Sequence, residues 1–293
     1  MTTNIELIVN RRCKTAENPL WHPDEQRLYW LDIPRGRLFR YDPCSNVHEL
    51  CYEAEEAIGG FTIQSDGALL LFMARGKVCI WRNGQGICNN VIDEIPRERE
   101  SRFNDVIADP EGRVYCGVMS TPQQAGRLYR LDTDGTLHVI EDAVGTSNGM
   151  GFTPDLKGFY HTDTRAHTIY IYDYERSTGK LDNRRPFTSI TEEGEARPDG
   201  MTVDAEGCLW SALWEGGAVI RLNRNGEEIF RIRLPVSKVS CPTFGGTDYQ
   251  QLYITTAGGD NREQEGYEAG GLFRFLPNVK GVPEFRSQIT IDS

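Results

Sequence analysis

Four pairs of polar residues recur at corresponding places along the chain. The pairs begin at Glu17, Asn104, Asn148 and Asp199, and each begins ten or eleven residues before a short apolar strand. The two other repeats have Gly59-Gly60 and Cys241-Pro242 at this position. Carboxylate and amide oxygens gathered at a partly buried site are costly unless they hydrogen-bond widely or hold a cation. The shared position therefore indicates a site at which these side chains converge.

A divalent cation would explain these residue types. Glu17 and Asp199 supply two negative charges and Asn148 adds a neutral carbonyl oxygen, whereas no cysteine or histidine cluster has zinc-finger spacing. Oxygen ligands suit Ca²⁺, Mg²⁺ or Mn²⁺, with Zn²⁺ and Fe²⁺ possible if water completes the shell. Three protein ligands would leave open positions, as in catalytic metal sites. The alternative is that Asn148 and Asp199 are ordinary turn residues beside glycines and that Glu17 is a surface acid.

The elements that must position these residues are strands in six repeats. One strand of each repeat begins with Gly in five of six cases, and these strands cover residues 36–42, 76–81, 126–132, 167–173, 217–223 and 271–275. A companion strand rich in β-branched and aromatic residues precedes each one, at residues 28–32, 69–72, 114–117, 159–163, 209–212 and 252–255. Repeats of strands alone at intervals of about 40–50 residues predict an all-β, six-bladed β-propeller. A large β-sandwich is the alternative, but it gives no reason for a sixfold recurrence.

The two ends of the chain are predicted to close the ring. Residues 5–9 and 285–291 both have strand-like patterns, so we expect them to share the final blade, with residues 1–293 forming a single domain. The innermost strands of a propeller run side by side along its axis. Residues at one phase of every repeat therefore meet at one end of the central tunnel.

Composition and charge argue against several classes of function. The net charge of −11 disfavours binding to nucleic acid, for which clustered Lys and Arg are the usual footprint. No apolar run approaches the roughly eighteen residues of a membrane span, and the N-terminus does not have the pattern of a signal peptide. The eight cysteines form no CxxC pair, and we interpret them as reduced core thiols. We expect a cytoplasmic protein, monomeric or weakly homo-oligomeric, without nucleic-acid or membrane partners.

Five ordered motifs also carry a resemblance to a known family. They are residues 16–21 (AENPLW), 101–105 (SRFND), 146–150 (TSNGM), 197–201 (RPDGM) and 240–246 (SCPTFGG). Together they make the chain resemble the gluconolactonase, regucalcin and senescence-marker-protein family over essentially its full length. The resemblance implies one divalent metal near the axis, held by Glu17, Asn148 and Asp199. It also implies that Arg102 and Asn104 face the substrate.

One departure from the family pattern concerns the sugar. Members that hydrolyse sugar lactones often have an acid after the Gly-x-Met of the third blade, whereas this chain continues Met119-Ser120. The departure falls in the part of the pocket that binds hydroxyl groups. We expect substrate choice to depend on the loops around residues 122–125 and 260–268.

The sequence thus predicts a metal-dependent lactonase that hydrolyses an aldonolactone, such as glucono-, xylono- or arabinono-lactone, to the aldonic acid. The divalent ion would polarise the lactone carbonyl, and Asp199 is expected to activate water. Arg102 is suited to bind sugar hydroxyls or the carboxylate formed on ring opening, and Asn104 to donate to the ring. Two alternatives stay open: a related metal-dependent hydrolase of another ester, such as a phosphotriester, and a non-enzymatic calcium-binding regulatory protein.

Overall fold

Six four-stranded antiparallel sheets make up the fold, which the computed structural model describes over residues 5–190 and 195–290. The first blade contains β2 (Ala16–His22), β3 (Arg27–Asp32), β4 (Arg37–Asp42) and β5 (Val47–Glu53), and the second β6 (Ile58–Ile63), β7 (Leu69–Met73), β8 (Val78–Arg82) and β9 (Gly86–Ile92). The third contains β10 (Phe103–Ala108), β11 (Val114–Val118), β12 (Gly126–Leu131) and β13 (Leu137–Val144).

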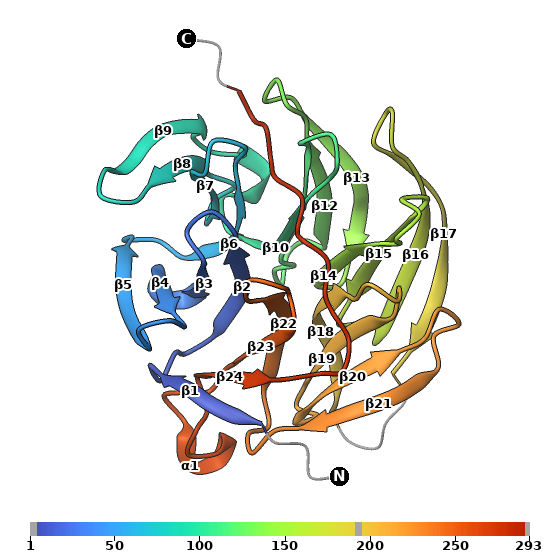
Figure 1. Cartoon of the computed structure of the whole chain (residues 1–293). Helices are drawn as coiled ribbons and strands as arrows, with labels where there is room; N and C mark the ends of the chain where they lie inside the picture. The colour runs from blue at the N-terminus through green and yellow to red at the C-terminus, as the bar shows by residue number, and fades with distance from the viewer. Residues whose placement is uncertain (1–4, 191–194, 291–293) are drawn as a thin grey trace.

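The remaining three blades follow the same plan. The fourth contains β14 (Ser147–Phe152), β15 (Gly158–Asp163), β16 (Thr168–Glu175) and β17 (Lys180–Ser189), and the fifth β18 (Arg197–Val203), β19 (Leu209–Trp214), β20 (Ala218–Leu222) and β21 (Glu228–Arg233). The sixth contains β22 (Val239–Gly245), β23 (Gln251–Thr256), β24 (Gly271–Phe275) and β1 (Glu6–Asn10). Short helices are η1 (Ile33–Arg35), η2 (Pro96–Glu98) and α1 (Arg262–Glu265). The six blades form the predicted β-propeller (Figure 1).

The innermost strands of the six blades surround the central axis (Figure 1). Two glycines allow neighbouring inner strands to approach closely. A Cβ atom on Gly59 would lie 1.9 Å from the carbonyl oxygen of Phe103, and one on Gly149 would lie 2.6 Å from that of Asp199. Backbone cannot yield as a flexible side chain can, so both positions require glycine.

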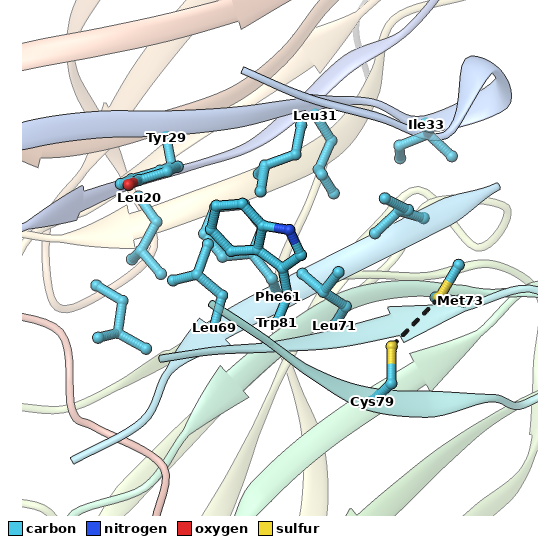
Figure 2. Packing of buried hydrophobic residues seen from close by; sticks show 13 residues of the cluster. Leu20, Tyr29, Leu31, Ile33, Phe61, Leu69, Leu71, Met73, Cys79 and Trp81 are labelled. Atoms are coloured by element: carbon cyan, nitrogen blue, oxygen red, sulfur yellow. Dashed lines mark hydrogen bonds between the residues drawn. The ribbon is translucent and has the colours of Figure 1, made fainter. Parts of the chain in front are cut away.

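The hydrophobic core lies between neighbouring blades, because each sheet buries its faces against the next one. Figure 2 shows the cluster between the first and second blades, where Tyr29 meets the edges of Phe61 and Trp81 with ring centroids 6.5 Å apart. Cys79 and Met73 are in sulfur contact at 3.6 Å in the same cluster. All eight cysteines of the chain lie in the described residues and none forms a disulfide, which agrees with the interpretation as thiols. Within the described residues, no helix is long and apolar enough to cross a membrane.

Closure of the ring agrees with the prediction at one end of the chain and differs at the other. Strand β1 pairs with β24, so the N-terminal run completes the final blade as expected. The prediction that residues 285–291 form a strand of that blade is wrong over the described residues 285–290. They form no strand and belong to no sheet, because their backbone makes only single hydrogen bonds to successive blades rather than a continuous ladder.

Residues 280–290 form instead what we call the C-terminal strap, which crosses one face of the ring (Figure 1). Backbone hydrogen bonds tie it to the fifth, sixth, second and third blades through Ala205, Tyr249, Ile63 and Gly112. It reaches the first blade through Arg286, which donates to both carboxylate oxygens of Asp24 at 2.7 and 2.8 Å, and the fourth through the ring contact of Phe285 with Phe152. The strap therefore contacts all six blades.

Candidate functional site

A cavity of about 300 Å³, lined by both charged and apolar side chains, lies at the end of the ring where the inner strands begin. Its lining residues are Thr15, Glu17, Ile33, Arg102, Asn104, Met119, Thr146, Asn148, Thr164, Arg165, Arg197, Asp199 and Trp214. All five site residues predicted from the sequence are among them. The structure thus brings together residues from four different blades, as the shared repeat phase requires.

A β-bulge in each inner strand accounts for this convergence. The register of pairing with the second strand shifts at the same phase in all six blades, for example between Glu17 and Leu20, between Asn148 and Met150, and between Pro198 and Met201. A bulge bends its strand and redirects local side chains, and such bulges are common beside active sites. In the first blade Asn18 has a φ of 47°, and its side-chain oxygen accepts a hydrogen bond from the backbone N–H of Phe61 in the neighbouring blade.

A chain of hydrogen bonds connects the polar side chains of the third and fourth blades. Arg102 Nη1 donates to Asn104 Oδ1 at 2.7 Å, and Asn104 Nδ2 donates to the carbonyl oxygen of Ser147 at 2.8 Å. The same amide lies 3.2 Å from Asn148 Oδ1. Asn148 Nδ2 in turn donates to Thr164 Oγ1 at 3.0 Å. The two asparagine amides are therefore oriented by fixed partners before any ligand arrives.

Three buried carboxyl groups lie close to one guanidinium. Glu17, Asp105 and Asp199 are each less than a tenth exposed. Burial raises the pKa of Glu17 well above its usual range, and the charges of Asp105 and Asp199 raise it further. Burial is also the main cause that raises the pKa of Asp199, and the charge of Asp105 raises it further. Burial raises the pKa of Asp105 to about 7. Arg102 alone does not compensate, because it supplies one positive charge against three carboxyl groups, and burial lowers its own pKa. The cluster thus lacks positive charge.

Asp105 is a residue of this cluster that the predicted site set omits. One ligand atom from each of Glu17, Asp105 and Cys241 lies within 4.8 Å of the others. Asp105 follows Asn104, and Cys241 has the corresponding phase in the sixth blade, so the repeat pattern contained a signal for both. The pattern could not tell which member of each pair faces the axis, because the bulges break the alternation of side chains.

Ser147 and His161 form a hydrogen-bonded pair behind the cavity. Ser147 Oγ and His161 Nε2 lie 2.8 Å apart, and neither residue has exposed surface. Burial lowers the pKa of His161 to about 4, so the imidazole is neutral. Since neither residue lines the cavity, the pair is placed to fix the Ser147 carbonyl that receives Asn104 rather than to attack a substrate.

The two loops expected to govern substrate choice do not line this cavity. Residues 122–124 border a separate surface hollow, where Gln124 Nε2 donates to the Arg97 carbonyl oxygen at 2.9 Å. In the segment 260–268, Glu265 forms an ion pair with Lys238. Each loop therefore makes its contact with a residue outside the lining of the cavity, Arg97 in one case and Lys238 in the other. Lining residues from other segments include Arg165, which lies two residues after β15, and Trp214, the last residue of β19. Both lie beyond the strand ends that the sequence pattern predicts.

Comparison with known proteins places the chain in a family. Residues 15–258 match the family model described as SMP-30/Gluconolactonase/LRE-like region. A pentonolactonase from Haloferax volcanii is 46% identical over 97% of this chain and 98% of its own, and regucalcin from Bos taurus is 32% identical over 96% and 97%. The crystal structure of a calcium-binding protein, regucalcin, from Agrobacterium tumefaciens superposes with a TM-score of 0.89 at 22% identity, covering 97% of both chains. The chain belongs to the SMP-30/gluconolactonase/LRE-like family.

Proposed function

We propose that this protein is a metal-dependent lactonase that opens a sugar lactone to the corresponding aldonic acid. The observation that carries the proposal is the convergence of Glu17, Asn148, Asp199, Arg102 and Asn104 on one cavity. The cavity volume of about 300 Å³ suits a single small sugar ring, since ligand pockets begin near this size. Similarity to a pentonolactonase over nearly the full chain supports the same class of substrate.

The residues present fit a divalent cation. The donor set consists of two carboxylates and an amide oxygen, to which Asp105 adds a third carboxylate beside Glu17. Their raised pKa values mark negative charge that burial disfavours and that a cation would stabilise. We assign Glu17, Asn148 and Asp199 as the residues that hold the ion. When bound, the ion would act as a Lewis acid toward the lactone carbonyl.

The side chains of the cavity would carry the remaining steps. We assign Asp199 as the base that takes a proton from the attacking water while the water oxygen bonds to the carbonyl carbon. When the bond from that carbon to the ring oxygen breaks, the proton would pass from Asp199 to the ring oxygen. Arg102, aligned by its hydrogen bond to Asn104 Oδ1, would donate to substrate oxygens and stabilise the new carboxylate. Asn104 would hold Arg102 in place beside the substrate, because the N–H groups of its amide already face Ser147 and Asn148.

A calcium-binding regulatory role is the second candidate, because the chain is also 32% identical to regucalcin. Arg102 and Asn104 distinguish the two candidates, since a calcium buffer has no use for oriented donors beside the ion. A phosphotriester hydrolase is less favoured, because the relatives compared above include a pentonolactonase that is 46% identical over nearly the full chain.

The test is hydrolysis of a panel of aldonolactones by metal-stripped protein to which Ca²⁺, Mg²⁺, Mn²⁺, Zn²⁺ or Fe²⁺ is added back. We expect metal-dependent ring opening that Asp199→Ala and Glu17→Ala abolish. Glu100→Ala is the matched control, because Glu100 is exposed near Arg102 but does not line the cavity. Tight Ca²⁺ binding without turnover above the spontaneous rate would contradict the lactonase and favour the regulatory role.

A further inference from the structure

Two arginines at the cavity have no role in the mechanism above. Arg165 lies directly after Thr164, and Arg197 lies directly before Pro198. Thr164 Oγ1 donates to the Pro198 carbonyl oxygen at 2.8 Å, so a hydrogen bond between their chain neighbours draws the two arginines to adjacent positions on the fourth and fifth blades. Both line the same cavity as Asp199.

These two guanidinium groups are poorly compensated by the protein. Arg165 is exposed and makes no hydrogen bond or ion pair within residues 5–190 and 195–290. The ion pair of Arg197 is with Glu195 at 3.8 Å, and that carboxylate is 77% exposed, so solvent screens it. The buried Nε of Arg197 has no hydrogen-bond partner among the described residues. Arg165 therefore retains donors that a ligand can occupy, and the terminal nitrogens of Arg197 have only a solvent-screened carboxylate as their ion-pair partner among the described residues.

The charge of the cavity contrasts with that of the protein. The chain has a net charge of −11, yet the described lining residues provide three guanidinium groups against two carboxylates. Asp105 beside Glu17 balances one of these charges, and a bound divalent cation adds two positive charges. Before its ring opens, a neutral lactone has no charged group with which Arg165 and Arg197 could pair. An anion gains from the positive charge, and a guanidinium binds carboxylate or phosphate oxygens through paired N–H donors.

We propose that Arg165 and Arg197 bind an anionic group on the substrate, so that the preferred substrates are lactones with a second acidic group away from the reacting carbonyl. This inference rests on the proposed lactonase function and names its substrate class. The acidic group can be a carboxylate or a phosphate, because both present anionic oxygens that a guanidinium binds. The group would sit beside the fourth and fifth blades, while the lactone carbonyl faces Glu17 and Asn148.

The experiment compares three lactones of one sugar on the metal-loaded protein: glucono-lactone, its 6-phosphate, and the lactone of the 1,6-dicarboxylic acid. We expect kcat/KM for at least one acidic lactone to exceed that for neutral glucono-lactone by tenfold or more. Arg165→Gln and Arg197→Gln should each lower the acidic-to-neutral ratio at least fivefold, mainly through KM. Which acidic lactone is favoured identifies phosphate or carboxylate as the recognised group.

Arg99→Gln is the matched control, because Arg99 is an exposed arginine outside the cavity, and it should leave the ratio unchanged. A wild-type preference for the neutral lactone, or an equal loss on all three lactones in both variants, would overturn the proposal while leaving the lactonase function standing. If no lactone is opened, the lactonase function fails separately. Calorimetric binding of the open-chain dicarboxylate against the uncharged sugar alcohol then decides the anion proposal: binding that Arg197→Gln removes supports it, and equal affinity for both compounds refutes it.

Discussion

Replacing Asp105 by Asn tests whether the buried carboxyl cluster is electrostatically strained without metal. Burial raises the pKa of Asp105 from 3.8 to about 7 in the folded chain. Below pH 4 both the folded and the unfolded chains keep the proton. As the pH rises toward 7 the unfolded chain releases it while the folded chain retains it, so the wild type loses stability over this window.

The expected change in unfolding free energy follows from the size of the rise in the pKa of Asp105. A tenfold change in an acid constant is worth about 1.4 kcal/mol, so the full window corresponds to roughly 4 kcal/mol of unfolding free energy, of which about 2 kcal/mol falls above pH 5.5. The asparagine side chain in Asp105→Asn has nearly the same shape as the aspartate side chain, but it does not titrate. The unfolding free energy of the variant minus that of the wild type should therefore increase by about 2 kcal/mol between pH 5.5 and pH 8.

The assay is urea unfolding of chelator-treated protein at both pH values, with Asp248→Asn as an exposed control that should give no such trend. Any constant cost of burying the new amide cancels in the comparison of the two pH values. Saturating divalent metal should shrink the difference, because the cation stabilises ionised carboxylates. A difference that stays flat within about 1 kcal/mol, or that falls with pH, would refute the electrostatic account of the cluster.

Three further outcomes are expected. Gly59→Ala should destabilise the fold by about 2–4 kcal/mol in urea unfolding, because the added Cβ would lie 1.9 Å from a backbone oxygen; a loss below about 1 kcal/mol would contradict the close approach. Asn104→Ala should lower kcat/KM for a lactone about 100-fold, and an unchanged rate would remove Asn104 from the site. Ending the chain after Gly281 should lower the melting temperature by about 6 °C or more, and an unaltered temperature would show that the strap adds no stability.

Repetition made the fold and the site accessible from the sequence. Six copies of one strand pattern predict six blades, and the common phase of Glu17, Asn148 and Asp199 predicts their convergence without any knowledge of long-range contacts. Convergence follows from the period because a propeller converts sequence period directly into angular position around an axis. Arg102 came from the family motif rather than from periodicity, and the structure places it on the same cavity.

Features without a repeat were missed for physical reasons. Arg165 and Arg197 line one cavity from two blades that a hydrogen bond between their chain neighbours joins, and no pattern of polarity encodes that bond. Residues 285–290 have the alternation of a strand, but a strand also needs a free edge to pair with, and β1 already covers the outer edge of the sixth blade. Asp105 was obscured because a bulge removes the two-residue alternation from which facing is judged.

The C-terminal strap also determines how molecules enter and leave the ring. Glu284 and Phe285 of the strap close off the middle of the ring, where the cavity measures about 50 Å³, enough for one or two water molecules but too small for a sugar. Among the described residues, the space beneath the strap is thus too small for a sugar to travel through the ring. A product must depart by the route along which the next substrate arrives, so the accumulated acid should inhibit competitively and its release should limit turnover when the ring-opening step is fast.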